Sequence, residues 1–218
     1  MPWELDHVFL ATSDPSLEAL ARDFGLQFTR RGVHHGQGTA NACAMFDNAF
    51  LELLFPVQPD EIVSELVRPL GLDERTRWRE TGACPFGICF RPLEPVPDVG
   101  ALPFETWPYR AAYLPAGASL PIVTPRGSLR EPLVFVMTQP RPPGQLQGSA
   151  HRGARRKLTA VSVVSPHDVD APGLRWFIDG GLLSVRRGPE YLLELIWDGG
   201  QTGASERLPA PLPLAVRW

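Results

Sequence analysis

Two stretches of the sequence, far apart in the chain, each place one glutamate inside an apolar, strand-like run. They are AFLELLF, with Glu52, and YLLELIW, with Glu194. An apolar segment precedes each of them in a similar order, because LDHVFLATSDP near the N-terminus is echoed by LTAVSVVSP in the last third of the chain. Two copies of one unit would each leave an apolar sheet face uncovered, and pairing them would hide both faces.

The first copy, residues 1–56, is expected to fold as a βαβββ module. WELDHVFLAT suits a buried strand, and SDPSLEALARDFGL has a capping serine, an early proline and apolar residues at helical spacing. QFTRRG, NACAMFD and AFLELLF then read as three strands, with an Asp-Asn turn between the last two.

The rest of the chain divides into residues 57–149 and residues 150–218. The first of these parts opens with a helix, PDEIVSELVRPLG, and continues as strand-like runs between proline-rich loops, whose pairing the pattern leaves open. The second part holds a degraded copy of the module and a proline-rich tail. The 24 prolines predict short elements and long loops, since proline breaks helices and removes strand donors. The predicted fold class is α+β.

The net charge and the cysteines limit the kinds of ligand and the cellular location that we expect. A net charge of −3 and a pI near 6.0 give no general attraction for nucleic acid or an anionic membrane, which favours a small-molecule ligand. The basic run HRGARRK could bind an anion but is more typical of a solvated strand edge. Cys43, Cys84 and Cys89 lack metal-ligand spacing and, without a secretory leader, predict a reducing, cytoplasmic location.

Alternation along the strands predicts one candidate site. His7 would share a strand face with Leu5 and Phe9, and Glu52 would face the same cavity from the fourth strand. A carboxylate inside an apolar sheet needs a charged partner, a metal or a proton. With Glu194, these residues make a His/Glu/Glu set suited to a divalent ion with open positions.

Other readings of these residues stay open. His7 could be a satisfied core histidine, and either glutamate could be exposed or paired with an arginine without any metal. Arginines available for such pairing are Arg155, Arg156, Arg186 and Arg187.

The loop HHGQGTAN adds polar groups before the third strand. Its glycines permit positive φ and close backbone approach, while His34 or His35, Thr39 and Asn41 could form directional hydrogen bonds with a ligand. The loop matches neither the phosphate-binding loop nor the dinucleotide fingerprint, so a plain hairpin connection is the alternative.

These segments resemble the vicinal oxygen chelate superfamily, and within it the glyoxalase-like domain proteins. LDHVFLAT with its following helix, HHGQGTAN and FLELLF are similar to the family's opening strand, its histidine-glycine-threonine-asparagine loop and its leucine-glutamate strand. A weaker likeness covers residues 150–198. The resemblance implies paired βαβββ modules that form a cup-shaped mixed sheet. In many members, histidines and glutamates on the first and last strands of each module hold a divalent metal.

Carried over residue by residue, the resemblance implies His7 and Glu52 as metal ligands of the first module and Glu194 as a ligand of the second. Ala160 stands where a fourth ligand is expected. That leaves a three-residue site, a substitute such as His151 or His34, or no metal at all. The ion would be iron, manganese, nickel, cobalt or zinc.

Other positions of the motif would act on the substrate. Glu52, displaced from the metal, or His34 or His35 would serve as the general base. Thr39, Asn41 and His151 are the candidates for contact with the substrate.

Two functions from different classes follow. One is a metal-assisted enzyme that acts on a small oxygen-bearing substrate, of lyase, isomerase or dioxygenase type. The other is a metal-free protein that binds or sequesters a small molecule, as bleomycin-resistance proteins do, and the residue Ala160 favours it. Either would be a monomer or a homodimer.

Overall fold

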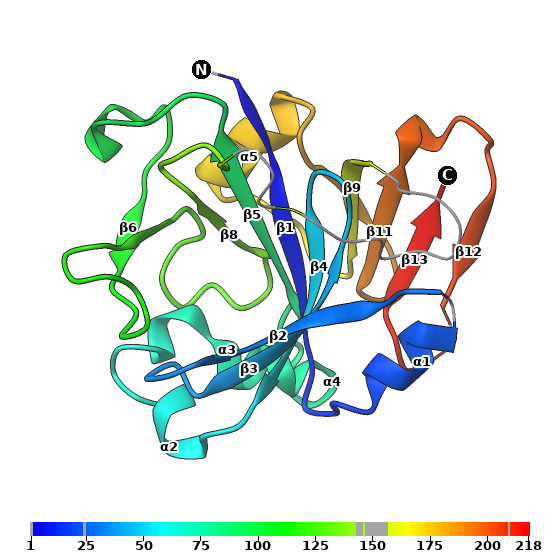
Figure 1. The fold of residues 1–218 in the computed structure, drawn as a ribbon, viewed down its shortest axis with the longest axis horizontal. Coiled ribbons are helices and arrows are strands. Elements are labelled where there is room, and N and C mark those ends of the chain that lie inside the picture. Colours follow the sequence, from blue (N-terminus) through cyan, green and yellow to red (C-terminus); the bar gives the residue numbers. More distant parts are fainter. Residues whose placement is uncertain (1, 24, 143–145, 147–156, 209) are drawn as a thin grey trace.

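The computed structural model describes residues 2–23, 25–142, 146, 157–208 and 210–218, and its strands form two sheets (Figure 1). The larger sheet has eight strands in the order β2-β3-β4-β1-β5-β8-β7-β6, and the smaller has five in the order β10-β9-β11-β13-β12. The strands of the larger sheet are β1 (Trp3–Ala11), β2 (Phe28–His34), β3 (Thr39–Met45), β4 (Phe50–Pro56), β5 (Phe86–Pro92), β6 (Trp107–Tyr109), β7 (Leu120–Ile122) and β8 (Leu133–Val136). Those of the smaller sheet are β9 (Leu158–Ser165), β10 (Ser184–Arg187), β11 (Leu192–Trp197), β12 (Ser205–Arg207) and β13 (Leu214–Arg217). The helices are α1 (Leu17–Asp23), α2 (Pro59–Ile62), α3 (Leu72–Thr76), α4 (Trp78–Thr81) and α5 (Pro172–Asp179), with 3-10 turns η1 (Arg68–Leu70), η2 (Val99–Ala101) and η3 (Asp198–Gly200).

The first half of the larger sheet has the expected βαβββ order. β1 pairs in parallel with β4, and antiparallel pairs then join β4 to β3 and β3 to β2. Helix α1 contributes the buried Leu17 and Ala21 to the hydrophobic core. The mixed sheet with few, short helices confirms the predicted α+β class.

The second half of the larger sheet comes from the proline-rich middle of the chain. β5 pairs in parallel with β8, as β1 does with β4, and the two halves meet where β1 and β5 run antiparallel. The order β5-β8-β7-β6 therefore mirrors β1-β4-β3-β2. Pro108 and Pro121 lie opposite each other on the three-residue strands β6 and β7, at the edge of the sheet where proline is tolerated.

The segment that echoes the first module does not complete the cup. The sequence predicts that residues 150–198 pair with residues 1–56, but β9, β10 and β11 belong to the smaller sheet. There β9 pairs antiparallel with β11 and parallel with β10, whereas β1 pairs parallel with β4. The echo is real in apolar patterning, but a pattern specifies which face of a strand is buried and not which strand lies beside it.

The two faces of the larger sheet are buried in different ways. On the outer face, Val8 and Phe90 share one core with Val163 of the smaller sheet and Phe177 of α5. The rings of Phe90 and Phe177 stack, with centroids 4.4 Å apart. The smaller sheet and α5 therefore cover the outside of the cup. The inner face carries a second apolar cluster, which includes Phe9, Leu54, Leu70, Leu72, Ile122, Leu133 and Phe135.

The helices of this fold are short. Helix α5 has eight residues, and no helix in the described part of the chain is long and apolar enough to cross a membrane. Cys43, Cys84 and Cys89 are free and buried.

Candidate functional site

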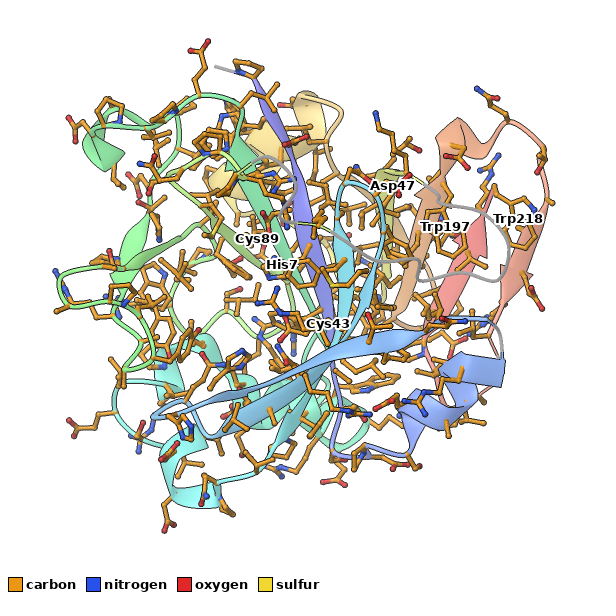
Figure 2. The ribbon with its side chains drawn as sticks, in the orientation of Figure 1. His7, Cys43, Asp47, Cys89, Trp197 and Trp218 are labelled. Carbon is orange, nitrogen blue, oxygen red and sulfur yellow. The ribbon has the colours of Figure 1, made fainter. Side chains whose placement is uncertain are left out.

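The hollow of the larger sheet contains a cavity of about 470 Å³. This volume lies within the range of about 300–1,000 Å³ that is usual for small-molecule sites. Figure 2 shows His7, Cys43 and Cys89 in the central region crossed by β1, β4 and β5, apart from Trp197 of β11 and from Trp218, which follows β13. Most of the cavity wall is apolar, formed by Phe9, Leu54, Leu70, Leu72, Leu114, Leu120, Ile122, Leu133 and Phe135.

A β-bulge in β1 decides which of its side chains face the cavity. The register between β1 and β5 shifts between Leu5 and His7, which inserts one residue into the strand. Leu5 therefore packs in the outer core, while Asp6 and His7 both line the cavity. The prediction that Leu5 shares a face with His7 and Phe9 is wrong, because the inserted residue reverses the alternation.

His7 is held in one orientation by its neighbours. Its Nδ1 lies 2.7 Å from Oδ1 of Asp6, and its ring stacks on Phe50 with centroids 4.4 Å apart. Asp6 also accepts hydrogen bonds from Arg91, at 3.0 Å, and from Arg141, at 2.7 Å. Because the carboxylate accepts, Nδ1 of His7 carries the ring proton and Nε2 presents a lone pair.

Glu52 is buried in β4 and faces His7. The residue is only 5% exposed, and Oε2 of its carboxylate lies 3.8 Å from Nε2 of His7. Its Oε1 accepts a hydrogen bond from Nδ2 of Asn41 at 2.8 Å. Cys43 lies in register with Glu52 on β3, and burial together with this carboxylate raises the pKa of the thiol to about 12. An imidazole and a carboxylate therefore converge on one side of the cavity.

His34 takes a neutral form in this arrangement. Its Nδ1 lies 3.0 Å from Oγ1 of Thr39, and its Nε2 lies 3.3 Å from Nδ2 of Asn41. Since Glu52 fixes the amide NH2 group of Asn41 toward itself, Nε2 of His34 must accept and Nδ1 must carry the proton. Burial lowers the pKa of His34 below its usual value, although the negative charge of Glu52 opposes this shift.

A chain of hydrogen bonds joins His34 to the second half of the sheet. Tyr109 and Tyr113 both donate to Oε1 of Gln37, at 3.1 and 3.2 Å. Nε2 of Gln37 then donates to Oγ1 of Thr39 at 2.8 Å. Gln37 is buried, and this chain ties the turn after β2 to β6 and to the segment that follows β6.

The glycines of the same turn are required by its geometry. Gly36 and Gly38 have φ of 76° and 78°, and both donate their backbone N–H groups to Oε2 of Glu61. A Cβ on Gly38 would lie 2.5 Å from the carbonyl oxygen of Gln58. The turn therefore depends on residues that accept positive φ and leave room for the neighbouring backbone.

The structure brings together five of the residues that the sequence singles out. His7, Glu52, His34 and Asn41 line the cavity, and Thr39 stands behind His34 as its hydrogen-bond partner. Fully buried, Thr39 is placed to orient the imidazole and not to touch a ligand.

Other predicted site residues lie elsewhere. His35 is exposed in the turn and does not line the cavity. Glu194 belongs to β11 of the smaller sheet, where its Oε1 lies 2.9 Å from Arg186, and Ala160 is on the adjacent strand β9. The set His7, Glu52 and Glu194 is therefore not assembled, because Glu194 is in the other sheet. His151 lies outside the described residues.

Several residues of the site escape sequence reasoning. Asp6 stands beside His7 in LDHVF, but strict alternation assigns it to the opposite face. Gln37 lies within HHGQGTAN, and Arg30 lies in the strand-like run QFTRRG. The sequence therefore points only weakly to either residue as part of the site. Arg141 comes from a proline-rich segment without regular patterning, and nothing in the local sequence points to it.

The donor groups of the first module do not fit a divalent ion. Nδ2 of Asn41 faces both Oε1 of Glu52 and Nε2 of His34. The lone pairs of these two atoms, which a metal would need, therefore accept N–H groups of the amide. This leaves Nε2 of His7 and Oε2 of Glu52. Two protein donors are fewer than the three that hold a catalytic zinc ion.

The second half of the larger sheet, β5 to β8, does not supply the missing metal ligands. The cup-facing positions of β5 and β8 are filled by glycine, cysteine, leucine and phenylalanine. Asp6, His7 and Cys89 form the one group in the described part of the chain whose potential ligand atoms lie within 4.8 Å of one another. Burial holds the pKa of the Cys89 thiol well above its usual value, and Nδ1 of His7 is already hydrogen-bonded to Asp6. Nδ1 of His7 therefore offers no lone pair to an ion there.

Comparison with known proteins agrees with this architecture. A profile described as a glyoxalase-like domain matches residues 5–171, and no curated protein matches the chain. A hypothetical protein from Staphylococcus aureus has a similar structure, with 12% identity and a TM-score of 0.53 over 100% of this chain and 98% of that one. A methylmalonyl-CoA epimerase from Streptomyces coelicolor has 17% identity and a TM-score of 0.41 over 67% of this chain and 98% of that one. Another, from Mycobacterium tuberculosis, has 18% identity and a TM-score of 0.37 over 64% and 89%. The profile spans all but the first two residues of the larger sheet, and the chain belongs to the glyoxalase-like domain family of the vicinal oxygen chelate superfamily.

Proposed function

We propose that this protein is a metal-independent acid–base enzyme that moves a proton on a small substrate held in the cup. The observation that carries the proposal is the approach of Nε2 of His7 to Oε2 of Glu52, 3.8 Å apart in the wall of one cavity. General acid–base catalysis needs such groups within reach of the transferred proton. An isomerase or a lyase that removes a proton next to a carbonyl group suits this pair.

The two residues have complementary tasks in this proposal. Glu52, as a carboxylate, takes a proton from the substrate, and His7, as an imidazolium, delivers one at a second position. Asp6 holds Nδ1 of His7 at 2.7 Å, and Oε2 of Glu52 lies 3.8 Å from its Nε2, which fixes the ring orientation for this transfer. After each forward turnover, the proton taken up by Glu52 returns to Nε2 of His7, 3.8 Å away, directly or through solvent, so both residues regain their starting protonation states. His34 and Asn41 orient Glu52.

The apolar wall of the cavity favours a substrate with an apolar body. Phe9, Leu54, Leu133 and Phe135 cover the inner face beside the acid–base pair. A cavity of this composition excludes water from the reacting groups, which strengthens electrostatic interactions inside it.

A second candidate is a binding protein that holds a small molecule without transforming it. The observation that favours it is the apolar character of the cup-facing positions on β5 and β8, since His7, His34 and Glu52 all belong to the first module. In that case, replacing Glu52 by glutamine should leave ligand affinity intact and there should be no reaction to lose.

The test of the enzyme proposal is proton exchange in deuterium oxide. Small carbonyl compounds with an apolar body are incubated with the wild type, Glu52→Gln and Glu194→Gln, and deuterium uptake is followed by NMR. Glu194→Gln is a matched control, because it also changes a glutamate in an apolar strand run but lies in the smaller sheet. We expect Glu52→Gln to slow exchange by roughly 10²- to 10⁴-fold and the control to match the wild type. Equal rates in all three proteins, or no exchange with any compound that binds, would contradict the proposal.

Metal titration tests the other half of the proposal. Since the described donors do not fit an ion, adding manganese, iron, cobalt, nickel or zinc should leave Tm unchanged, and a chelator should leave proton exchange unchanged. Ligands that bind only the folded state raise Tm, so a true site would be visible. A rise in Tm that saturates near one equivalent and is lost in His7→Gln would show that a metal site forms after all.

A cytoplasmic location remains part of the proposal. It is supported by the three cysteines, which are free and buried.

A further inference from the structure

We propose that the substrate of the cup carries a carboxylate, which Arg30 and Arg141 receive beside the acid–base pair. This inference rests on the proposed function, because it names the class of substrate for the same cavity. The substrate would then be a small carboxylic acid with an apolar body.

Arg30 is an exposed cation that lines the cavity. It lies on β2 in register with Cys43 of β3, which is itself in register with Glu52 of β4, and its side chain lines the cavity. Arg30 makes no ion pair with any residue that the structure describes. Its neighbour Arg31, by contrast, donates to both carboxylate oxygens of Glu18 at 2.7 Å. The guanidinium group of Arg31 is thus occupied by Glu18, whereas that of Arg30 can bind a ligand.

Arg141 offers a second unused donor. Its Nη2 donates to the carboxylate of Asp6, at 2.7 Å, and to the backbone carbonyl of Asp6, at 3.1 Å. Its Nε is buried and has no partner among the described residues, although the side chain lines the cavity. A buried donor without an acceptor is unfavourable, and a ligand oxygen would supply the acceptor.

The charge of the lining favours a single negative charge on the ligand. In the cavity wall Arg141 pairs with Asp6, and Arg31 pairs with Glu18, so Arg30 is the guanidinium group that no described carboxylate neutralises by contact. A ligand with one negative charge would meet Arg30 without displacing either of these pairs. A dianion would add a surplus negative charge close to Glu52.

The geometry of these donors favours a carboxylate among monoanions. Guanidinium groups bind planar carboxylates through paired N–H donors, which gives both affinity and orientation. One strand separates Arg30 from Glu52, so their backbones lie about 10 Å apart, and both side chains reach into the space between. A small acid held by Arg30 would therefore present the carbon next to its carboxylate toward Glu52.

The test compares matched ligands that differ only in charge. Binding of phenylacetate, phenylacetamide and benzylphosphonate is measured by isothermal titration calorimetry for the wild type, Arg30→Gln and Arg31→Gln. We expect phenylacetate to bind at least about 10-fold more tightly than the amide, and Arg30→Gln to weaken phenylacetate by roughly 10- to 100-fold without changing the amide. The matched control Arg31→Gln, which removes a neighbouring cation already tied to Glu18, should change affinity by less than about threefold.

Three outcomes would overturn the proposal. The first is equal binding of acid and amide, or no binding of either, by the wild type. The second is an equal loss of phenylacetate affinity in Arg30→Gln and Arg31→Gln. That result would mean that the general positive charge near the cavity, and not a contact with Arg30, attracts the ligand. The third is tighter binding of the phosphonate with the same dependence on Arg30, which would make the site one for a dianion.

The same variants separate this proposal from the enzyme proposal. If phenylacetate binds through Arg30 but no carboxylic acid undergoes proton exchange, the carboxylate site stands and the enzyme proposal fails. If exchange occurs on neutral carbonyl compounds at a rate that Arg30→Gln does not change, the enzyme proposal stands and the carboxylate site fails.

Discussion

The two histidines that face Glu52 differ in their partners, and this difference assigns them different tasks. His7 has two carboxylates beside its ring, with Nδ1 2.7 Å from Asp6 and Nε2 3.8 Å from Glu52. His34 has an uncharged hydroxyl and an uncharged amide as hydrogen-bond partners, and burial lowers its pKa. We infer that His7 exchanges protons with the substrate, whereas His34 stays neutral and holds Asn41 in place.

Lowering the pH should reduce stability through His34. Its pKa is lowered from 6.5 in the folded state, so below that pH the unfolded chain binds the proton more readily and the free energy of unfolding falls. The stabilising contribution of neutral His34 is therefore present above pH 6.5 and is lost as the pH falls below that value. We expect His34→Gln to flatten the decrease in unfolding free energy between about pH 7 and about pH 5, measured by urea denaturation. His35→Gln is the control, since His35 is exposed in the same turn. A profile for His34→Gln parallel to the wild type would contradict this assignment.

At the scale of elements, one buried arginine joins the segments that close one end of the cup. Arg75 of α3 is 1% exposed and donates to the backbone carbonyls of Leu70, Cys84, Ser128 and Glu131, at distances of 2.7 to 3.0 Å. These carbonyls belong to η1, to the segment before β5 and to the loop before β8. Because Leu70 itself lines the cavity, Arg75 helps to set its wall.

Replacing Arg75 by methionine should destabilise the fold strongly. The change would leave four carbonyls without their donor in a buried site, which should cost roughly 3–5 kcal/mol. Urea denaturation measures the loss. Arg77→Met is a matched control on the same stretch of chain: Arg77 is exposed, and its replacement should change stability by about 0.5 kcal/mol or less. A cost below about 1 kcal/mol for Arg75→Met would show that other donors replace the guanidinium.

At the scale of the whole molecule, the two sheets depend on one core. Residues on the outer face of the larger sheet, such as Val8 and Phe90, pack in the same cluster as Val163 of the smaller sheet and Phe177 of α5. Without the smaller sheet, the outer face of the cup would expose a large apolar surface to water. The cup and the smaller sheet are therefore expected to unfold together.

Phe177→Ala tests this coupling. The side chain is fully buried and stacks on Phe90, so its truncation should cost roughly 3–5 kcal/mol and should lower the stability of both sheets. Far-ultraviolet circular dichroism and tryptophan fluorescence should report one coincident urea transition, shifted to lower denaturant. Leu93→Ala, at a residue that is 49% exposed, is the control and should change little. Two separate transitions would show that the sheets unfold independently.

The local sequence determined the parts of this protein that depend on nearest neighbours. The α+β class and the order β1-α1-β2-β3-β4 follow from apolar periodicity, capping and turn residues, all of which act over a few positions. The convergence of His7 and Glu52 was also predictable, because alternation on two strands of one module places both on the same sheet face. The glycines of the turn before β3 were recognisable for the same local reason.

Only the tertiary structure decided which segments lie beside that module. The apolar echo at residues 158–197 suggested the partner, yet residues 86–136 complete the cup, because strand pairing over long sequence separations is selected by the packing of the whole core. The bulge that brings Asp6 beside His7, and the approach of Arg141 from the segment after β8, depend on those pairings. Periodicity specifies which face of a strand is buried, and the fold of the entire chain specifies what that face meets.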